Sequence, residues 1–391
     1  WQGKLQLTLQ PQGYRYQGQW QSSLRGLALA LPAPYTKAAS NARPFRLSAR
    51  GDQNASQLQA EWQPGWRWQG DWLPAKQMFS RFWLGNQQLE PTGQTWAPFH
   101  LQLNFPELDA DAWQAWWQRI QAADASASTS SSQLLSSLPV QRSWQLVVPK
   151  FRWQQQSWDK LTLSGRQDPQ QQEWKLLANQ VTASARRQGT QPWSLDLVYL
   201  DWHPDDKTAA AAPAPMPSRA EQLSTLAAIP PFNLTCQRCV LGKQQLGRLE
   251  MQVRPTATGL NVDNLLLQQG NNKVSGQGAW QLTAGASQSQ LQLNGQIASL
   301  ETWLQALDYP LGFSGTPASF DSQLTWQGPL YRFDKPSLAG KLRFESGEGM
   351  LRNMGSTGTR LLSVFSLHAV MRRLSLDFSD VFEQGFFFKS I

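Results

Sequence analysis

Short segments in which apolar and polar residues alternate run along almost the whole chain, and they constrain the fold more than any other feature. GKLQLTL (Gly3–Leu9) puts its three leucines on one side, and HLQLNF (His100–Phe105) repeats the pattern. Alternate residues of a β-strand point to opposite faces of its sheet. Gly, Pro and Asn turns separate the segments, as in a meander of antiparallel strands. The sequence therefore predicts an all-β chain with a minor α content, whose sheets have one apolar and one polar face.

The apolar residues are spread along the chain and are not gathered in blocks. No run of about 18 apolar residues is present, so we expect no transmembrane helix in this stretch, and no signal peptide is visible. The net charge of +8 is diffuse, without the basic, aromatic-rich stripe that nucleic-acid binding needs. We therefore expect no nucleic acid as a partner, and at most a weak attraction to anionic lipid surfaces.

Two short helices are expected, each directly after an LQLN segment. In the first, Asp109 is the predicted N-cap, and one apolar stripe is formed by Trp113, Trp116, Trp117 and Ile120. In the second, Ser299 takes the capping position and Trp303 the matching place in the stripe. This internal repeat predicts two units, each a β-meander followed by a helix, as in repeat architectures. A third, more apolar helix is expected over Arg360–Met371, where we favour capping of an apolar groove over contact with a membrane or a partner.

Composition divides the chain further. Residues 122–142 are Ala/Ser-rich and predict a loop, and residues 203–220 are Ala/Pro-rich and predict a linker. The expected organisation is a β-meander unit ending in the Trp-rich helix (1–121), that loop, a second meander (143–202), the linker, a meander unit ending in a short helix (221–310) and a C-terminal segment (311–391). The chain ends at FFFKSI within an apparent strand, which predicts a piece of a longer protein.

The alternating apolar sets are the candidate binding surface. Each set has two interpretations: it lines an apolar groove, or it forms the ordinary closed core of a β-sandwich. The residue pattern alone leaves both open. The sets are Leu5, Leu7 and Leu9; Leu27, Leu29 and Leu31; Leu101, Leu103 and Phe105; Leu249, Met251 and Val253; Leu291 and Leu293; Leu342 and Phe344; Leu374, Leu376 and Phe378; Phe386 and Phe388.

Cys236 and Cys239 form a CxxC segment, and they are the chain's two cysteines. In a fully extended strand their Cα atoms would be about 10 Å apart, too far for a disulfide, whereas a local turn would allow one. Both states stay open. A zinc site is not expected, because no second CxxC exists and the three histidines are distant in sequence. No nucleophile-elbow, zinc-protease, phosphate-loop or dinucleotide motif is present, so we expect neither enzymatic activity nor a cofactor.

Several segments resemble YhdP-type proteins of the AsmA-like family. They are SSLRGLALALPAPYTK (Ser22–Lys37), LTWQGPL (Leu324–Leu330), GKLRFESGEGML (Gly340–Leu351) and RLLSVFSL…RRLSLDFSDVFEQGFFF (Arg360–Phe388). The Ala/Ser-rich and Ala/Pro-rich insertions and the CxxC segment have no counterpart in that pattern. The family is related in architecture to TamB, YdbH and the bridge-like lipid transfer proteins. The resemblance implies an elongated, repeat-like antiparallel sheet that curls into an apolar groove, with short helices at its edges.

The same resemblance implies a bacterial periplasmic conduit that carries phospholipids between the inner and outer membranes and supports the outer-membrane barrier. It implies an N-terminal inner-membrane helix missing from this stretch, phospholipid acyl chains as ligands, and an outer-membrane or periplasmic protein as partner. The first alternative is a non-enzymatic scaffold for envelope or outer-membrane protein assembly, which should have a closed core. The second is a carbohydrate-binding or glycan-processing β-protein, prompted by the 20 tryptophans. It would need several Trp rings exposed on one flat face.

Overall fold

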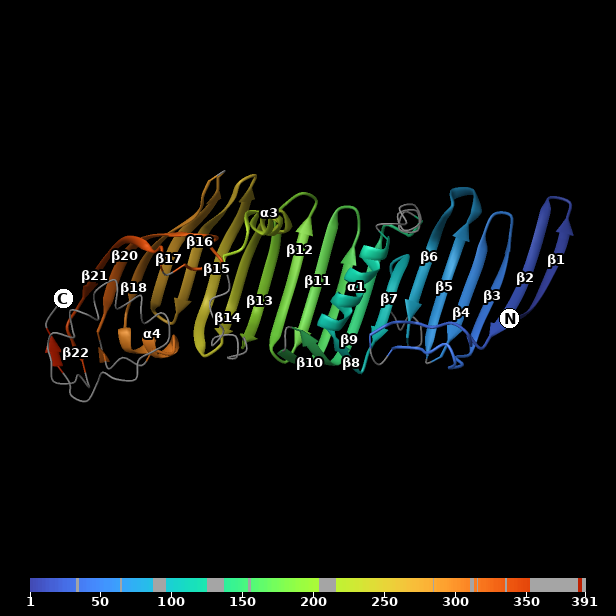
Figure 1. Cartoon of the computed structure of the whole chain (residues 1–391), viewed down its shortest axis with the longest axis horizontal. Helices are drawn as coiled ribbons and strands as arrows, with labels where there is room; N and C mark the ends of the chain where they lie inside the picture. Colours follow the sequence, from blue (N-terminus) through green and yellow to red (C-terminus); the bar gives the residue numbers. More distant parts are fainter. Residues whose placement is uncertain are drawn as a thin grey trace. The chain divides into compact units, whose positions relative to one another are not determined.

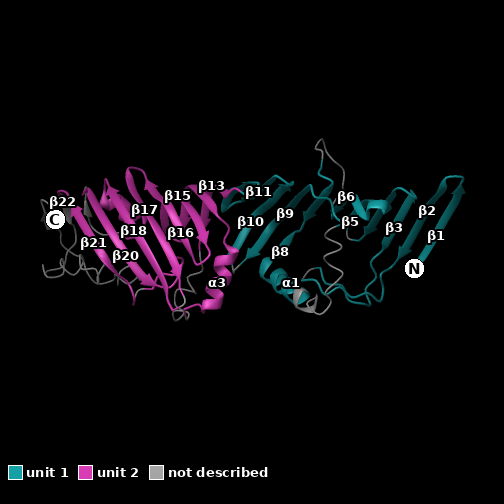
Figure 2. Cartoon of the chain, turned by 90° about the horizontal axis from the view of Figure 1, so that it is seen from above, with its two compact units in different colours: residues 1–190 teal, residues 191–391 magenta. Residues whose placement is uncertain are grey.

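The computed structural model describes residues 1–32, 35–63, 65–86, 96–124, 137–153, 156–203, 216–283, 285–309, 313–314, 316–334, 336–351 and 386–388. The chain divides into two compact units, Trp1–Thr190 and Gln191–Ile391 (Figure 2). Both are dominated by β-strands, which confirms the all-β prediction.

Unit 1 is a single sheet whose strands mostly follow one another in chain order (Figure 1). Each alternating segment lies in a strand because its apolar residues then share one face. The strands are β1 (Gln2–Gln10), β2 (Gly13–Ser22), β3 (Phe45–Asp52), β4 (Ser56–Trp62), β5 (Trp66–Leu73), β6 (Met78–Gly85), β7 (Phe99–Asn104), β8 (Glu107–Asp109), β9 (Arg142–Trp153), β10 (Gln156–Gln167), β11 (Gln171–Ala178) and β12 (Val181–Gln188), with a 3₁₀ turn η1 (Pro74–Lys76) between β5 and β6.

The pairing is antiparallel from β1 to β6 and from β9 to β12, but parallel at β6–β7, β7–β9 and β8–β9. Parallel neighbours need a crossover connection. Between β8 and β9 that crossover contains helix α1 (Ala110–Asp124). The predicted cap is confirmed, because the backbone N–H of Ala112 donates to Asp109 Oδ1 over 3.1 Å. This bond is the main reason why the pKa of Asp109 lies below its ordinary value.

Unit 2 repeats the design. Its main sheet runs in the order β13, β14, β15, β16, β17, β18, β20, β21, and only β13–β14 is parallel. A small antiparallel sheet contains β19, β22 and β23. The bounds are β13 (Trp193–Trp202), β14 (Phe232–Leu241), β15 (Gln244–Thr256), β16 (Gly259–Gln269), β17 (Asn272–Leu282), β18 (Ser287–Ile297), β19 (Phe313–Ser314), β20 (Ala318–Gln327), β21 (Ala339–Ser346), β22 (Gly349–Leu351) and β23 (Phe386–Phe388).

Two helices belong to unit 2. Helix α3 (Arg219–Ala228) lies in the β13–β14 crossover and begins with a capping box between Ser218 and Glu221. It starts at the end of the Ala/Pro-rich stretch, where the composition predicted a linker. Helix α4 (Leu300–Ala306) follows β18, and Ser299 caps it as predicted by accepting from the Thr302 N–H. Unlike α1, this helix joins antiparallel neighbours, β18 and β20.

The segment between β2 and β3 is a loop, so the strand expected over Leu27, Leu29 and Leu31 is wrong. One isolated bridge, between Leu29 and Lys37, is its sole described β-pairing. Lys37 is 1% exposed, and its ammonium donates to the carbonyls of Leu24, Leu27 and Ala38 at 2.8, 2.6 and 3.2 Å. The chain therefore wraps around a buried cation instead of extending. The helix expected over Arg360–Met371 lies outside the described residues.

Candidate functional site

One face of the unit 1 sheet carries an unbroken row of apolar and small residues across eleven strands, β1–β7 and β9–β12. Each member is the direct register partner of the next, so all of them lie on the same face. Ala60 is the single fully buried member, Trp174 is 39% exposed, and the other large side chains are half-buried. The row consists of Gly3, Trp20, Leu47, Ala60, Trp68, Leu84, Leu101, Trp144, Gly165, Trp174 and Ala185.

A second row runs beside the first across β1–β7, and it ends in a polar residue at β9. Its first member is Leu5, one of the predicted groove residues. The row consists of Leu5, Gly18, Ala49, Leu58, Gly70, Phe82 and Phe99. We call the two rows the open face of unit 1, because most of their large side chains are partly exposed.

Unit 2 has two rows of the same kind, each crossing all eight strands of its main sheet. We call them the apolar face of unit 2. The first consists of Trp193, Phe232, Val253, Val262, Gly278, Leu291, Leu324 and Gly340, and the second of Leu197, Cys236, Leu249, Leu267, Val274, Gly295, Phe320 and Phe344.

The opposite faces are polar. In unit 1 the corresponding row is Lys4, Gln19, Ser48, Gln59, Gln69, Trp83, His100, Ser143, Arg166, Glu173 and Arg186. Water can solvate most of such a face, so the apolar face is the one that must be covered, either by protein or by a ligand.

In unit 1 the strand ends beside the open face are covered by protein. Phe105, Val148 and Leu161 form a buried cluster there, on which Tyr35 from the loop after β2 packs. The Tyr35 ring lies 4.9 Å from that of Phe105 and 6.1 Å from that of Trp113 on α1. The loop after β2 and helix α1 thus cover a buried core at these strand ends, beside the half-buried rows of the open face.

Unit 2 has two covered regions. Leu226 of α3 packs on a cluster that includes Trp280, whose exposure is 0% and whose Nε1–H donates to Ser287 over 3.0 Å. Leu300 of α4 closes a second cluster with Val274, and Trp303 packs against it. Helices α3 and α4 therefore each cover part of the unit 2 sheet.

Most predicted groove residues in the described strands lie on these faces, with different degrees of burial. Leu7 and Leu9 share the face of Leu5, and all three are exposed, at 62% for Leu5, 58% for Leu7 and 79% for Leu9. Phe105 and Val253 lie in closed core clusters. The remaining members, which are half-buried except for exposed Leu342, are Leu101, Leu103, Leu249, Met251, Leu291, Leu293, Leu342 and Phe344.

Other predicted residues fall elsewhere. Leu27, Leu29 and Leu31 lie in the loop after β2. Phe386 and Phe388 lie in β23, whose side chains are not described. Leu374, Leu376 and Phe378 lie outside the described residues.

Sequence reasoning missed most of the Trp, Ala and Gly members of the rows, such as Trp20, Ala60 and Gly165. In segments like QLQAEW and RWQGDW, these residues alternate with Gln or charged residues as the leucines do elsewhere. The alternation with Gln was the signal that could have identified them.

The two cysteines form a disulfide with a Cα–Cα distance of 6.0 Å. Between them β14 has two residues where β15 has one, which is a β-bulge. The bulge lets Cys239 share the apolar face with Cys236, although their odd separation would place them on opposite faces of a regular strand. Both are buried, at 0% for Cys236 and 5% for Cys239.

His100 is the one strongly perturbed base among the described residues. It is 5% exposed on the polar side of unit 1, its ring stacks on Trp96 at 4.2 Å, and its Nδ1 lies 2.7 Å from Ser143 Oγ. Burial lowers its pKa to about 4. No carboxylate of the described residues bonds to the imidazole, so this pair lacks the group that orients the base of a catalytic triad.

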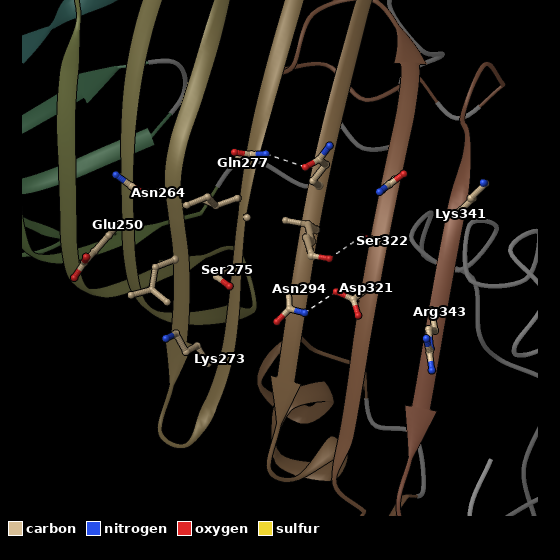
Figure 3. A pocket seen from close by; sticks show the side chains of 16 residues that line it. Glu250, Asn264, Lys273, Ser275, Gln277, Asn294, Asp321, Ser322, Lys341 and Arg343 are labelled. Carbon is tan, nitrogen blue, oxygen red and sulfur yellow. Dashed lines mark hydrogen bonds between the residues drawn. The ribbon is translucent and has the colours of Figure 1, made fainter.

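A hollow of about 840 Å³ opens in unit 2 over β15–β18, β20 and β21, and it is lined mostly by polar side chains together with Leu265, Leu266 and Leu293 (Figure 3). Two hydrogen bonds cross its floor, from Gln277 to Gln292 and from Asn294 to Asp321. Lys341 and Arg343 stand on β21 at one side. The hollow is therefore mainly polar, in contrast to the apolar rows.

Nowhere in the described ranges do three or more His, Cys, Asp or Glu side chains gather as they would to hold a metal ion. Within the same part of the chain, every helix is too short or too polar to span a bilayer.

The sequence was compared with known families, curated proteins and solved structures. The sequence profile of the family described as YhdP protein matches residues 1–391. The chain is similar to the intermembrane phospholipid transporter YhdP of Escherichia coli (strain K12), with 23% identity over 408 residues. That alignment covers 100% of this chain and 30% of the relative, so the chain spans less than a third of the relative's length. No solved structure matches the chain.

Proposed function

The chain belongs to the YhdP protein family, and from this premise we propose that it forms part of a conduit that carries phospholipids between two membranes. The E. coli relative is named for phospholipid transport between membranes. The observation that carries the proposal is the set of unbroken apolar rows. The first row of unit 1 spans ten strand-to-strand steps, or roughly 48 Å along the sheet at the usual strand spacing.

The chemistry of the rows suits an acyl chain. Each CH₂ that leaves water for an apolar surface contributes about 0.8 kcal/mol, and the contact has no directional preference. A chain can therefore be held strongly in total while it shifts along the row without breaking any one strong bond. The half-buried state of most large row residues supports this use, because a closed core would leave no surface for a ligand.

We place the conduit in the bacterial periplasm, linked to the inner membrane through a helix outside this chain and to an outer-membrane or periplasmic partner at its other end. The headgroup would remain in water at the polar rim while the acyl chains lie on the apolar face. No step needs a catalytic residue or a cofactor. Delivery of phospholipid by this route would support the barrier of the outer membrane.

Native mass spectrometry with lipid identification tests the proposal on protein extracted gently from envelopes. Leu58→Asp places a charge in the open face, whereas Gln59→Asp places the same charge on the neighbouring residue of β4, which faces the polar side. We expect phospholipids on the parent and on Gln59→Asp, and a large loss from Leu58→Asp. Leu291→Asp and Gln290→Asp form the equivalent pair on β18.

A folded parent protein without lipid would refute the conduit and favour the scaffold alternative. Equal lipid on Leu58→Asp and Gln59→Asp would show that the open face is not the binding surface. The barrier role is tested separately in source cells that lack the gene, where entry of a hydrophobic dye should rise and the intact gene should reverse it.

A further inference from the structure

Aromatic rings on the open face of unit 1 lie over glycines, and the clearest case joins β9, β10 and β11. A Cβ added to Gly165 would lie 2.4 Å from the Cε2 and Cζ2 atoms of Trp144. The Trp144 indole therefore occupies the space above that glycine. Its ring centroid is 4.6 Å from that of Trp174, in an edge-to-face arrangement. Rings from β9 and β11 thus meet over the glycine of the strand between them.

The same arrangement recurs at the other end of the open face. A Cβ on Gly3 would lie 2.2 Å from Trp20 Cδ1, and one on Gly18 would lie 2.2 Å from Trp20 Cη2. One indole therefore spans two glycines, one on β1 and one on β2. At Gly70, an added Cβ would meet Trp68 at 2.8 Å and Phe79 at 3.0 Å.

Glycine in the interior of a strand weakens it, because glycine loses more backbone entropy on folding and has no side chain to pack. An aromatic ring that covers the glycine recovers part of that loss. The ring must recline along the sheet to do so. A side chain that stands upright would instead project into the space of about 10 Å in which a second layer packs on a sheet face.

We propose that Gly3, Gly18, Gly70 and Gly165 set the depth of the lipid path by letting these rings recline on its floor. This inference rests on the proposed conduit. The glycines act as positioning residues, because the rings above them occupy the space that a ligand would otherwise reach and the glycines work through those rings. A methyl group at any of them would lift the ring into the volume that the acyl chains need.

Gly165→Ala tests the proposal on the full chain, with Gly278→Ala as the matched control. Gly278 also lies on an apolar row, but an added Cβ there would meet nothing closer than 3.4 Å, an ordinary contact. We expect Gly165→Ala to reduce co-purified phospholipid about tenfold, the effect of a modest overpacking cost on an equilibrium. Gly278→Ala should keep the lipid content of the parent.

A second substitution checks that the ring is the obstacle. Trp144→Leu in the Gly165→Ala background removes the displaced indole and should restore lipid to the parental amount. Gly18→Ala, beneath Trp20, provides an independent test if Gly165→Ala does not fold, as judged by circular dichroism.

The outcomes separate this inference from the conduit itself. If the parent carries lipid and folded Gly165→Ala and Gly18→Ala carry the same amount, the glycine proposal is wrong and the conduit stands. If Trp144→Leu fails to restore binding, the ring is not the cause and the proposal is also overturned. If the folded parent carries no lipid, the conduit fails and the glycine role fails with it.

Discussion

Acidification from pH 7 to about pH 5 should destabilise unit 1 through His100. The imidazole is 5% exposed, and its face is covered by Trp96. Its Nδ1 bonds with Ser143, while its Nε2 is buried without a hydrogen-bond partner in the described protein. Protonation would place a charge where little solvent can reach it. Burial therefore lowers the pKa of His100 from 6.5 to about 4.

The direction of the pH effect follows from comparing the two states. The unfolded chain takes up the proton near pH 6.5, whereas the folded protein resists it until about pH 4. The stability that neutral His100 contributes is therefore fully present above pH 6.5, the pKa in the unfolded chain, and it is lost as the pH falls to about 4. A shift of this size is worth about 3 kcal/mol over the whole window, of which about 2 kcal/mol is lost by pH 5.

Hydrogen exchange followed by mass spectrometry measures this loss locally, after correction for the intrinsic effect of pH on exchange. Peptides from β7 and β9 report on His100 and Ser143, and peptides from β16 and β17 serve as a reference in unit 2. His100→Gln cannot titrate in this range, so its β7 and β9 peptides should lose about 2 kcal/mol less protection than those of the parent. Equal losses in parent and variant between pH 7 and pH 5 would refute the assignment.

Three further predictions concern stability. Lys37→Met removes the donor to three carbonyls and should release the loop after β2, with a local cost of about 3 kcal/mol or more; unchanged resistance of that loop to limited proteolysis would contradict this. Replacing Cys236 and Cys239 by Ser opens a very short covalent loop and should lower the stability of unit 2 by about 2 kcal/mol in urea unfolding, and a variant as stable as the parent would show that the bulge holds without the bond. Trp280→Ala should lower the free energy of unfolding by about 3–5 kcal/mol, because the indole is fully buried. Trp174→Ala, at a residue that is 39% exposed, should lower it clearly less in thermal unfolding. Equal losses would argue against the separation of core and open face.

The β-class and the two-faced sheets were predictable because the period of two is local. Leu101 and Leu103 share a face in any extended backbone, whatever their strand pairs with. The caps at Asp109 and Ser299 were predictable for the same reason, since each bond spans three residues. The domain boundaries drawn from composition stay a prediction.

The register that builds continuous rows was not predictable from local pattern. Gly165 becomes part of the open face only because β10 pairs with Trp144 on one side and Trp174 on the other. The Ala/Ser-rich and Ala/Pro-rich stretches lie in two of the crossovers, but composition does not indicate that the strands they join are parallel neighbours. In the loop after β2, the local pattern was misleading. The alternating leucines predict a strand, but the chain bends so that three carbonyls accept hydrogen bonds from the buried ammonium of Lys37.

The faces also show why a surface intended for a ligand need not make the fold unstable. The fully buried side chains, such as Trp280 and Val148, lie under helices and loops at the covered margins, where burial contributes most per residue. The half-buried rows contribute less, and water or an acyl chain can exchange on them. Stability and lipid binding therefore depend on largely different residues. In unit 1, substitutions at the margins should therefore unfold the protein, whereas substitutions in the rows should change what it carries. In unit 2 the separation is less complete, because Val253 and Val274 belong both to a row and to a buried cluster.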